Sequence, residues 1–144
     1  MDTRVLNWLL DNKGKVFASP RDEVYGSHTK DFKISSIGQD RVYVKFGGKK
    51  YEALALVFQM FDRVLDYLAA NKTRVVRLGA RIAPPYDSET LESVIWKEPY
   101  PVGTVPYKAS PHVCDILCLA GIIRYVSATN PITGRQVQAV KLRE

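Results

Sequence analysis

The spacing of apolar residues predicts a chain that mixes short helices with antiparallel strands. Apolar positions that recur every three or four residues predict four helices, over residues 2–12, 55–70, 87–97 and 110–120. The third is expected to be capped by Asp87 or Ser88, and the fourth begins Ser110-Pro111, with proline at the first helical position. The chain therefore belongs to the α+β class once its strands are added.

Alternating apolar and polar residues predict the strands. Three form an antiparallel meander over residues 32–37, 41–46 and 49–54, and three more cover residues 73–78, 122–128 and 136–142. Residues 15–29 lack a clear pattern and are predicted to be mostly loop, with a short strand at Val16-Phe17.

The Gly47-Gly48 pair predicts a two-residue turn in the meander, because glycine tolerates positive φ. That turn would place Val44 opposite Tyr51 and Lys45 opposite Lys50. Two lysines directly opposite each other repel, and a bound polyanion would relieve that repulsion. The alternative is a solvated lysine edge that prevents sheets from pairing.

The composition is typical of a soluble globular protein and disfavours membrane-spanning and disulfide-rich classes. The chain has 144 residues, of which 46% are hydrophobic and 25% charged, as in soluble globular proteins. No apolar run reaches the roughly 18–20 residues of a membrane-spanning helix, so no membrane partner is expected. The two cysteines, Cys114 and Cys118, are four apart, which disfavours a disulfide framework and favours the cytoplasm.

The net charge of +6 favours an anionic partner, and its distribution is uneven. Residues 53–100 are neutral overall, and there is no acidic residue between Ile122 and Arg143. The positive charge therefore lies toward the two ends of the chain.

From residue 55 onward, the order helix, strand, helix, helix, strand, long turn, strand resembles the winged-helix fold, a helix-turn-helix variant. Residues 110–126 (SPHVCDILCLAGIIRYV) are similar to that fold's third helix running into its wing, and Gly121 permits the left-handed turn between them. The hairpin from Tyr125 to Lys141, with Asn-Pro-Ile-Thr-Gly-Arg at its tip, is similar to the wing. The expected organisation is therefore an N-terminal helix and meander over residues 1–54 and a winged-helix-like domain over residues 55–144, or one compact unit.

The resemblance implies that the third helix enters the major groove of DNA while the wing contacts the backbone or minor groove. It places Ser110, His112 and Asp115 toward the bases, with Lys108 near a phosphate. The candidate nucleic-acid-binding residues are Lys108, Ser110, His112, Asn130, Thr133 and Arg135, with Lys45, Lys49 and Lys50 as a second patch. Because the third helix is unusually apolar, it could instead be a core helix or a protein-binding surface.

Catalytic and metal-binding patterns are weak. His112, Cys114 and Cys118 form an H-x-C-x3-C string, but zinc needs four ligands and His112 would face away from Cys118. A hydrolase would need His28 to meet an acid in a cleft. We therefore expect neither an enzyme nor a cofactor.

The sequence thus predicts a double-stranded DNA-binding protein, a regulator or accessory recognition module, with homodimerisation plausible. The alternative is a winged-helix scaffold that binds another protein and no nucleic acid.

Overall fold

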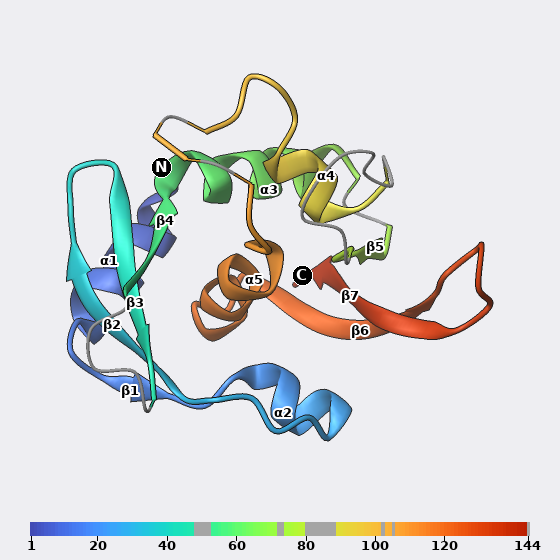
Figure 1. The fold of residues 1–144 in the computed structure, drawn as a ribbon, viewed down its shortest axis with the longest axis horizontal. Helices are drawn as coiled ribbons and strands as arrows, with labels where there is room; N and C mark the ends of the chain where they lie inside the picture. The colour runs from blue at the N-terminus through green and yellow to red at the C-terminus, as the bar shows by residue number, and fades with distance from the viewer. Residues whose placement is uncertain (48–52, 72–73, 80–88, 102, 105, 144) are drawn as a thin grey trace.

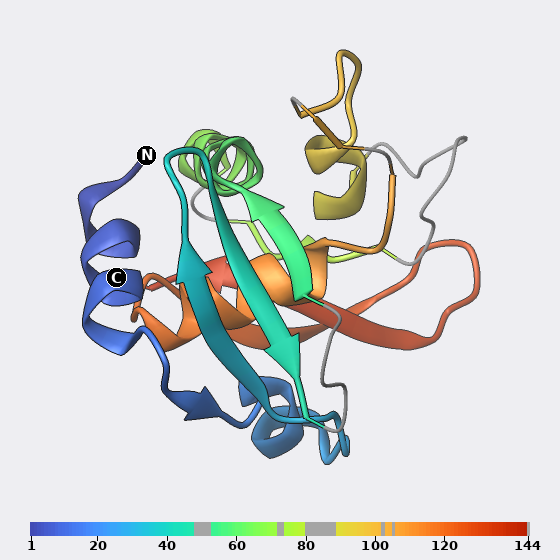
Figure 2. The same cartoon turned by 60° about the vertical axis from the view of Figure 1, so that its left-hand side comes forward.

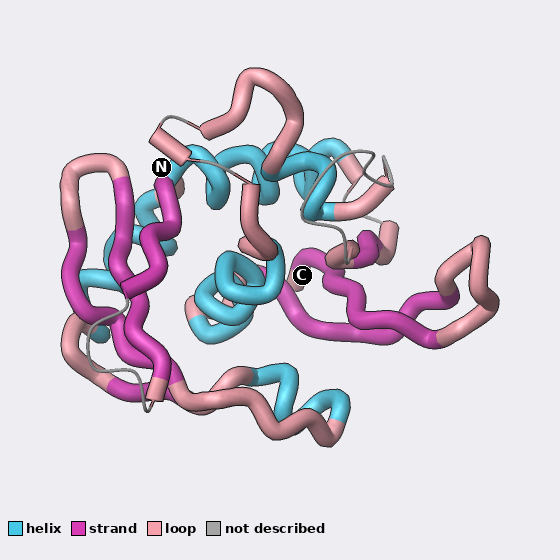
Figure 3. Tube along the Cα trace, in the orientation of Figure 1, coloured by secondary structure: helices cyan, strands magenta, loops and turns pink. Residues whose placement is uncertain are grey.

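A computed structural model describes residues 1–144 apart from 48–52, 72–73, 80–88, 102, 105 and 144. It is an α+β structure with two antiparallel sheets, and Figures 1 and 3 place helix α5 between them. Helix α1 (Thr3–Asn12) confirms the first predicted helix. Its N-terminus is capped by Asp2, whose carboxylate accepts from the Arg4 N–H at 2.8 Å, and Val5 and Leu9 are buried.

The N-terminal sheet has the order β1-β2-β3-β4. Strands β2 (Phe32–Ile37) and β3 (Arg41–Phe46) were predicted from the alternation of apolar and polar residues. Strand β1 (Val16–Phe17) was predicted as a short strand in a segment without a clear pattern. Phe32, Ile34, Val42 and Val44 form its buried face.

The predicted register of the third strand is wrong, and residues 49–52 of that strand lie outside the described residues. Strand β4 is Ala53–Val57, and Val44 pairs with Leu54 and Lys45 with Ala53. These pairs replace the predicted pairs of Val44 with Tyr51 and of Lys45 with Lys50, which the two-residue Gly-Gly turn required. On its other side, Lys45 is directly opposite Lys33 of β2.

Helix α2 (Pro20–Tyr25) lies where a loop was predicted. The Ser19 hydroxyl caps it by accepting from the Arg21 N–H, Pro20 occupies its first turn, and Asp22 and Glu23 complement the helix dipole. Gly26, at φ +68°, ends it in the left-handed region.

The middle of the chain covers the core from one side. Helix α3 (Phe58–Ala70) starts three residues later than predicted, because residues 55–57 continue β4. Strand β5 (Val76–Arg77) is shorter than predicted. Helix α4 (Leu91–Ile95) is capped by Thr90, which corrects the expected cap at Asp87 or Ser88, two residues outside the described part of the chain.

Helix α5 (Ser110–Leu119) is the central helix of the fold. One side faces the N-terminal sheet, where the His112 ring lies 5.0 Å from the Phe46 ring, and Figure 2 shows that sheet lying across the helix. Ser110, Pro111 and every residue from Val113 to Leu117 are buried. Burial on both sides leaves no fully exposed residue on this helix.

The chain ends in a hairpin of β6 (Ile123–Thr129) and β7 (Gln136–Leu142), close to the predicted bounds. With β5 they form the second sheet, of order β5-β7-β6. We call this hairpin, residues 122–143, the ribbon. It extends away from the rest of the molecule at the right of Figure 1.

One continuous hydrophobic cluster draws side chains from the whole chain, from Val5 and Leu9 at one end to Ile123 and Val140 at the other. The predicted boundary between residues 54 and 55 falls inside β4. Within the described ranges, no helix has both the length and the apolar character needed to cross a lipid bilayer.

Candidate nucleic-acid interface

The cations of the ribbon share one of its faces. In the antiparallel ladder Arg124 is paired with Lys141, and Val126 with Ala139. Backbone hydrogen bonds continue the same register at both ends, from the Arg143 N–H to Ile122 and from the Asn130 N–H to Arg135. Because residues two apart lie on the same face of a strand, the face holding Arg124 and Lys141 also holds Arg135 and Arg143. We call these four residues the cationic face.

The opposite face of the ribbon supports it. Its root, with Ile123, Tyr125 and Val140, is buried in the core. Toward the tip that face becomes polar, with Ser127 and Gln136 exposed. On the cationic face Ile122 and Ala139 are buried as well, whereas the side chains of Arg124, Arg135 and Arg143 are exposed.

Arg124 and Lys141 are directly opposed cations at the ribbon root. No carboxylate of a described residue lies within salt-bridge distance of either one. Like charges at directly opposite positions destabilise a sheet. A polyanion lying across this root would remove that repulsion.

The polar residues predicted at the tip build the turn. The Asn130 side-chain oxygen accepts from the N–H groups of Ile132 and Thr133 at 2.8 and 3.3 Å. The Thr133 hydroxyl accepts from the Arg135 N–H at 3.3 Å. These two acceptors, expected to contact DNA, therefore hold the shape of the loop, and Arg135 remains exposed.

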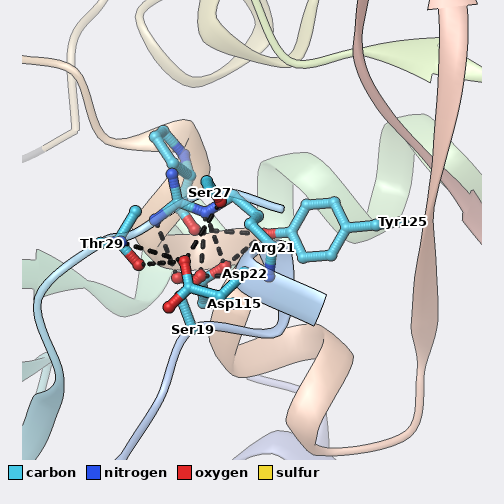
Figure 4. A network of polar contacts seen from close by, with 8 residues as sticks. Ser19, Arg21, Asp22, Ser27, Thr29, Asp115 and Tyr125 are labelled. Atoms are coloured by element: carbon cyan, nitrogen blue, oxygen red, sulfur yellow. Dashed lines mark hydrogen bonds and ion pairs between the residues drawn. The ribbon is translucent and has the colours of Figure 1, made fainter. Parts of the chain in front are cut away.

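A buried polar network fixes the root of the ribbon to the body. The guanidinium of Arg21, from α2, donates two hydrogen bonds of 3.0 Å to the carboxylate of Asp115, from α5. The Tyr125 hydroxyl, from β6, donates to the same carboxylate at 2.5 Å. Figure 4 shows these three side chains converging from separate elements. Asp115 is thus fully engaged inside the protein, which corrects its expected position near the bases.

Tyr25 adds a second attachment. Its hydroxyl lies within hydrogen-bond distance of the carbonyl oxygens of Val126 and Ala139, one on each strand of the ribbon, and its ring meets Tyr125 edge to face at 5.9 Å. The ribbon root is therefore held by side chains from α2 and α5 together, and its direction from the body is determined by packing.

Of the residues predicted around the third helix, Lys108 is exposed and the others are not. Lys108 lines a hollow of about 460 Å³ together with Ser127 and Gln138 from the polar face of the ribbon. Ser110 has 0% exposure, so it cannot reach a base, and this corrects its predicted role. His112 is half-buried against Phe46.

Burial acts on the protonation of His112 and Glu92. It lowers the pKa of His112 from 6.5 to about 4, against the opposing influence of the Asp115 carboxylate, so the imidazole is neutral. It raises the pKa of Glu92 from 4.5 to about 7, even though the Glu92 carboxylate accepts from the N–H groups of Ala109 and Ser110 at 3.0 Å. Glu92, from α4, thereby satisfies the first donors of α5, whose own cap residue, Ala109, has no side-chain acceptor.

The second predicted patch lies elsewhere. Lys45 is on β3, at the left of Figure 1, while the ribbon extends to the right. Lys49 and Lys50 are outside the described residues. The structure therefore does not bring Lys45 together with the cationic face.

The described residues do not bring together the other candidate groups, which were considered for metal binding and catalysis. Cys114 is buried, burial raises its pKa, and no described group of three or more histidine, cysteine or acidic residues is arranged to hold a metal ion. His28 is exposed in the loop before β2, and the Asp22 carboxylate nearby accepts from Ser27 and Thr29. The described residues thus contain no His28–acid pair in a cleft.

Comparison with known proteins identifies no relative: no protein-family model, no curated protein and no solved structure matches this chain.

Proposed function

We propose that this protein binds double-stranded DNA in the cytoplasm, as a regulator or accessory recognition module, through the cationic face of its ribbon. The observation that carries the proposal is the placement of Arg124, Arg135, Lys141 and Arg143 on one face of a protruding hairpin with no acidic residue between positions 122 and 143. Such a surface neutralises phosphates and releases the counterions that surround them.

The dimensions of the ribbon suit a duplex. The cationic face runs from Arg143, beside Ile122, to Arg135, beside Asn130. These two arginines are eight strand steps apart, so the ends of the face are roughly 26 Å apart at the usual strand rise. That distance exceeds the ~12 Å width of the major groove, so the two ends can contact phosphates of both strands.

Single-stranded DNA is a less suitable ligand for the ribbon than a duplex. Proteins that bind single strands stack bases on exposed aromatic rings. The one aromatic residue of the ribbon, Tyr125, is buried. Binding is therefore expected to depend on phosphate contacts, and the buried α5 plays a structural role in this proposal.

Replacing Arg124 and Lys141 together by glutamine tests the proposal. The plot of log affinity against log salt for a duplex of random sequence should become less steep by about 2, because two phosphate contacts are lost. Fluorescence anisotropy at several salt concentrations measures this slope.

The chain offers a matched control in Lys33 and Lys45, another pair of directly opposed cations, on the N-terminal sheet. Replacing both by glutamine changes the net charge equally and should leave the slope unchanged. If both double variants reduce the slope equally, binding follows net charge rather than the ribbon, and the proposal is wrong. If the wild type binds no duplex, the alternative of a protein-binding scaffold is favoured.

A further inference from the structure

The tip of the ribbon presents one apolar side chain to solvent. Ile132 is 85% exposed, the highest value among the large hydrophobic residues that the structure describes. It lies between Pro131 and Thr133 in the turn that joins β6 to β7, three residues before Arg135. An isoleucine in this position buries little of its side chain in the folded protein.

The loop that carries Ile132 is closed by its own hydrogen bonds. The Gly134 N–H donates to the Asn130 carbonyl and the Asn130 N–H donates to the Arg135 carbonyl, both at 2.8 Å. The Asn130 side chain binds the Ile132 N–H, and Gly134 adopts φ +71°, which glycine tolerates. The loop therefore holds Ile132 outward before any partner arrives, and little ordering is required on binding.

We propose that Ile132 is an apolar wedge that enters the minor groove and inserts between two base pairs of the bound duplex. This inference rests on the proposed function and adds that the protein unstacks and bends its DNA. Minor-groove proteins insert isoleucine, leucine or phenylalanine in this way and kink the duplex by about 20–90°. Arg135 would hold the adjacent phosphates.

The energies favour a duplex over a lipid surface as the occupant. Burying one isoleucine side chain releases a free energy comparable to the cost of unstacking one base step. The same contribution gives only weak attachment to a bilayer, and the tip offers no second large apolar side chain. The cations at both ends of the ribbon supply the remaining attraction to a duplex, and flexible steps such as TA unstack most easily.

The test uses the full chain with Ile132→Ala and with the conservative Ile132→Leu. The probe is a duplex with one central TA step, 2-aminopurine beside that step, and a fluorophore pair at its ends. With the wild type we expect increased 2-aminopurine fluorescence and a shorter end-to-end distance. Ile132→Ala should abolish both signals and weaken binding about tenfold, which corresponds to about 1.4 kcal/mol, without changing the salt slope. Ile132→Leu should retain both signals.

A second control is Val24→Ala, which shortens an exposed apolar side chain on α2, and it should change neither signal. If the wild type binds the duplex but leaves it stacked and straight, the wedge is wrong and the proposed function stands. If the wild type binds no duplex, both are wrong. If Ile132→Ala binds DNA normally but loses binding to vesicles of phosphatidylcholine and phosphatidylglycerol, the tip inserts into lipid and the wedge is again wrong.

Discussion

Replacing Asp115 by asparagine should lower the free energy of unfolding by about 3–5 kcal/mol, because the substitution leaves the Arg21 guanidinium buried without its counter-charge. The Arg21 and Asp115 side chains are 13% and 3% exposed, so water cannot replace the lost partner. The same substitution weakens the bond from Tyr125 and therefore loosens the root of the ribbon. Urea denaturation of the two proteins measures the difference.

Two further variants separate the buried charge from the hydrogen bond. Tyr125→Phe removes one hydrogen bond but retains the ion pair, and should cost only about 1.5 kcal/mol. The double variant Arg21→Met with Asp115→Leu removes both charges and should recover much of the stability lost in Asp115→Asn. A double variant no more stable than Asp115→Asn would contradict this explanation.

The second large effect is a pair of opposing pH dependences from His112 and Glu92. Between pH 4 and 6.5 the unfolded chain protonates His112 and the folded protein does not, so this group makes stability rise with pH. Between pH 4.5 and 7 the folded protein retains a proton on Glu92 that the unfolded chain has released, so this group makes stability fall with pH. Each contributes up to about 3 kcal/mol over its range, at about 1.4 kcal/mol per pH unit, and together they should nearly cancel.

Single substitutions should reveal each slope. With Glu92→Gln, the free energy of unfolding should rise between pH 4 and 6.5 as His112 acts alone. With His112→Gln, it should fall between pH 4.5 and 7 as Glu92 acts alone. Chemical denaturation at a series of pH values measures both. Parallel pH profiles for the wild type and the two variants would show that burial does not shift these groups.

Local patterns predicted much of the secondary structure but not its connections. Strands β2 and β3 have the predicted bounds, because alternation over six residues with one buried face has no competing interpretation. Residues 53–57 were ambiguous, since a short apolar run fits either a strand or the first turn of a helix. Helix α2 carried a readable signal, Ser19-Pro20 followed by two acids, of the same kind that located α5.

Only part of the candidate site was predicted from the sequence, because local patterns do not show which distant residues share a surface. Arg135 was predicted from its place at the tip, while Arg124, Lys141 and Arg143 were not, although the hairpin register and the two-residue period together place them on the same face. The burial of α5 and its capping by Glu92 depend on contacts between distant segments, and no local pattern encodes them. The N-terminal sheet covers the helix face that the resemblance assigned to DNA.

The salt dependence of duplex binding by the unmodified protein tests the central claim most directly. If the four cations of the ribbon contact phosphates, log affinity should fall with log salt with a slope of about −3.6 between roughly 50 and 200 mM. A slope near zero, or no binding at the lowest salt concentration, would contradict the claim that the ribbon is a DNA-binding surface.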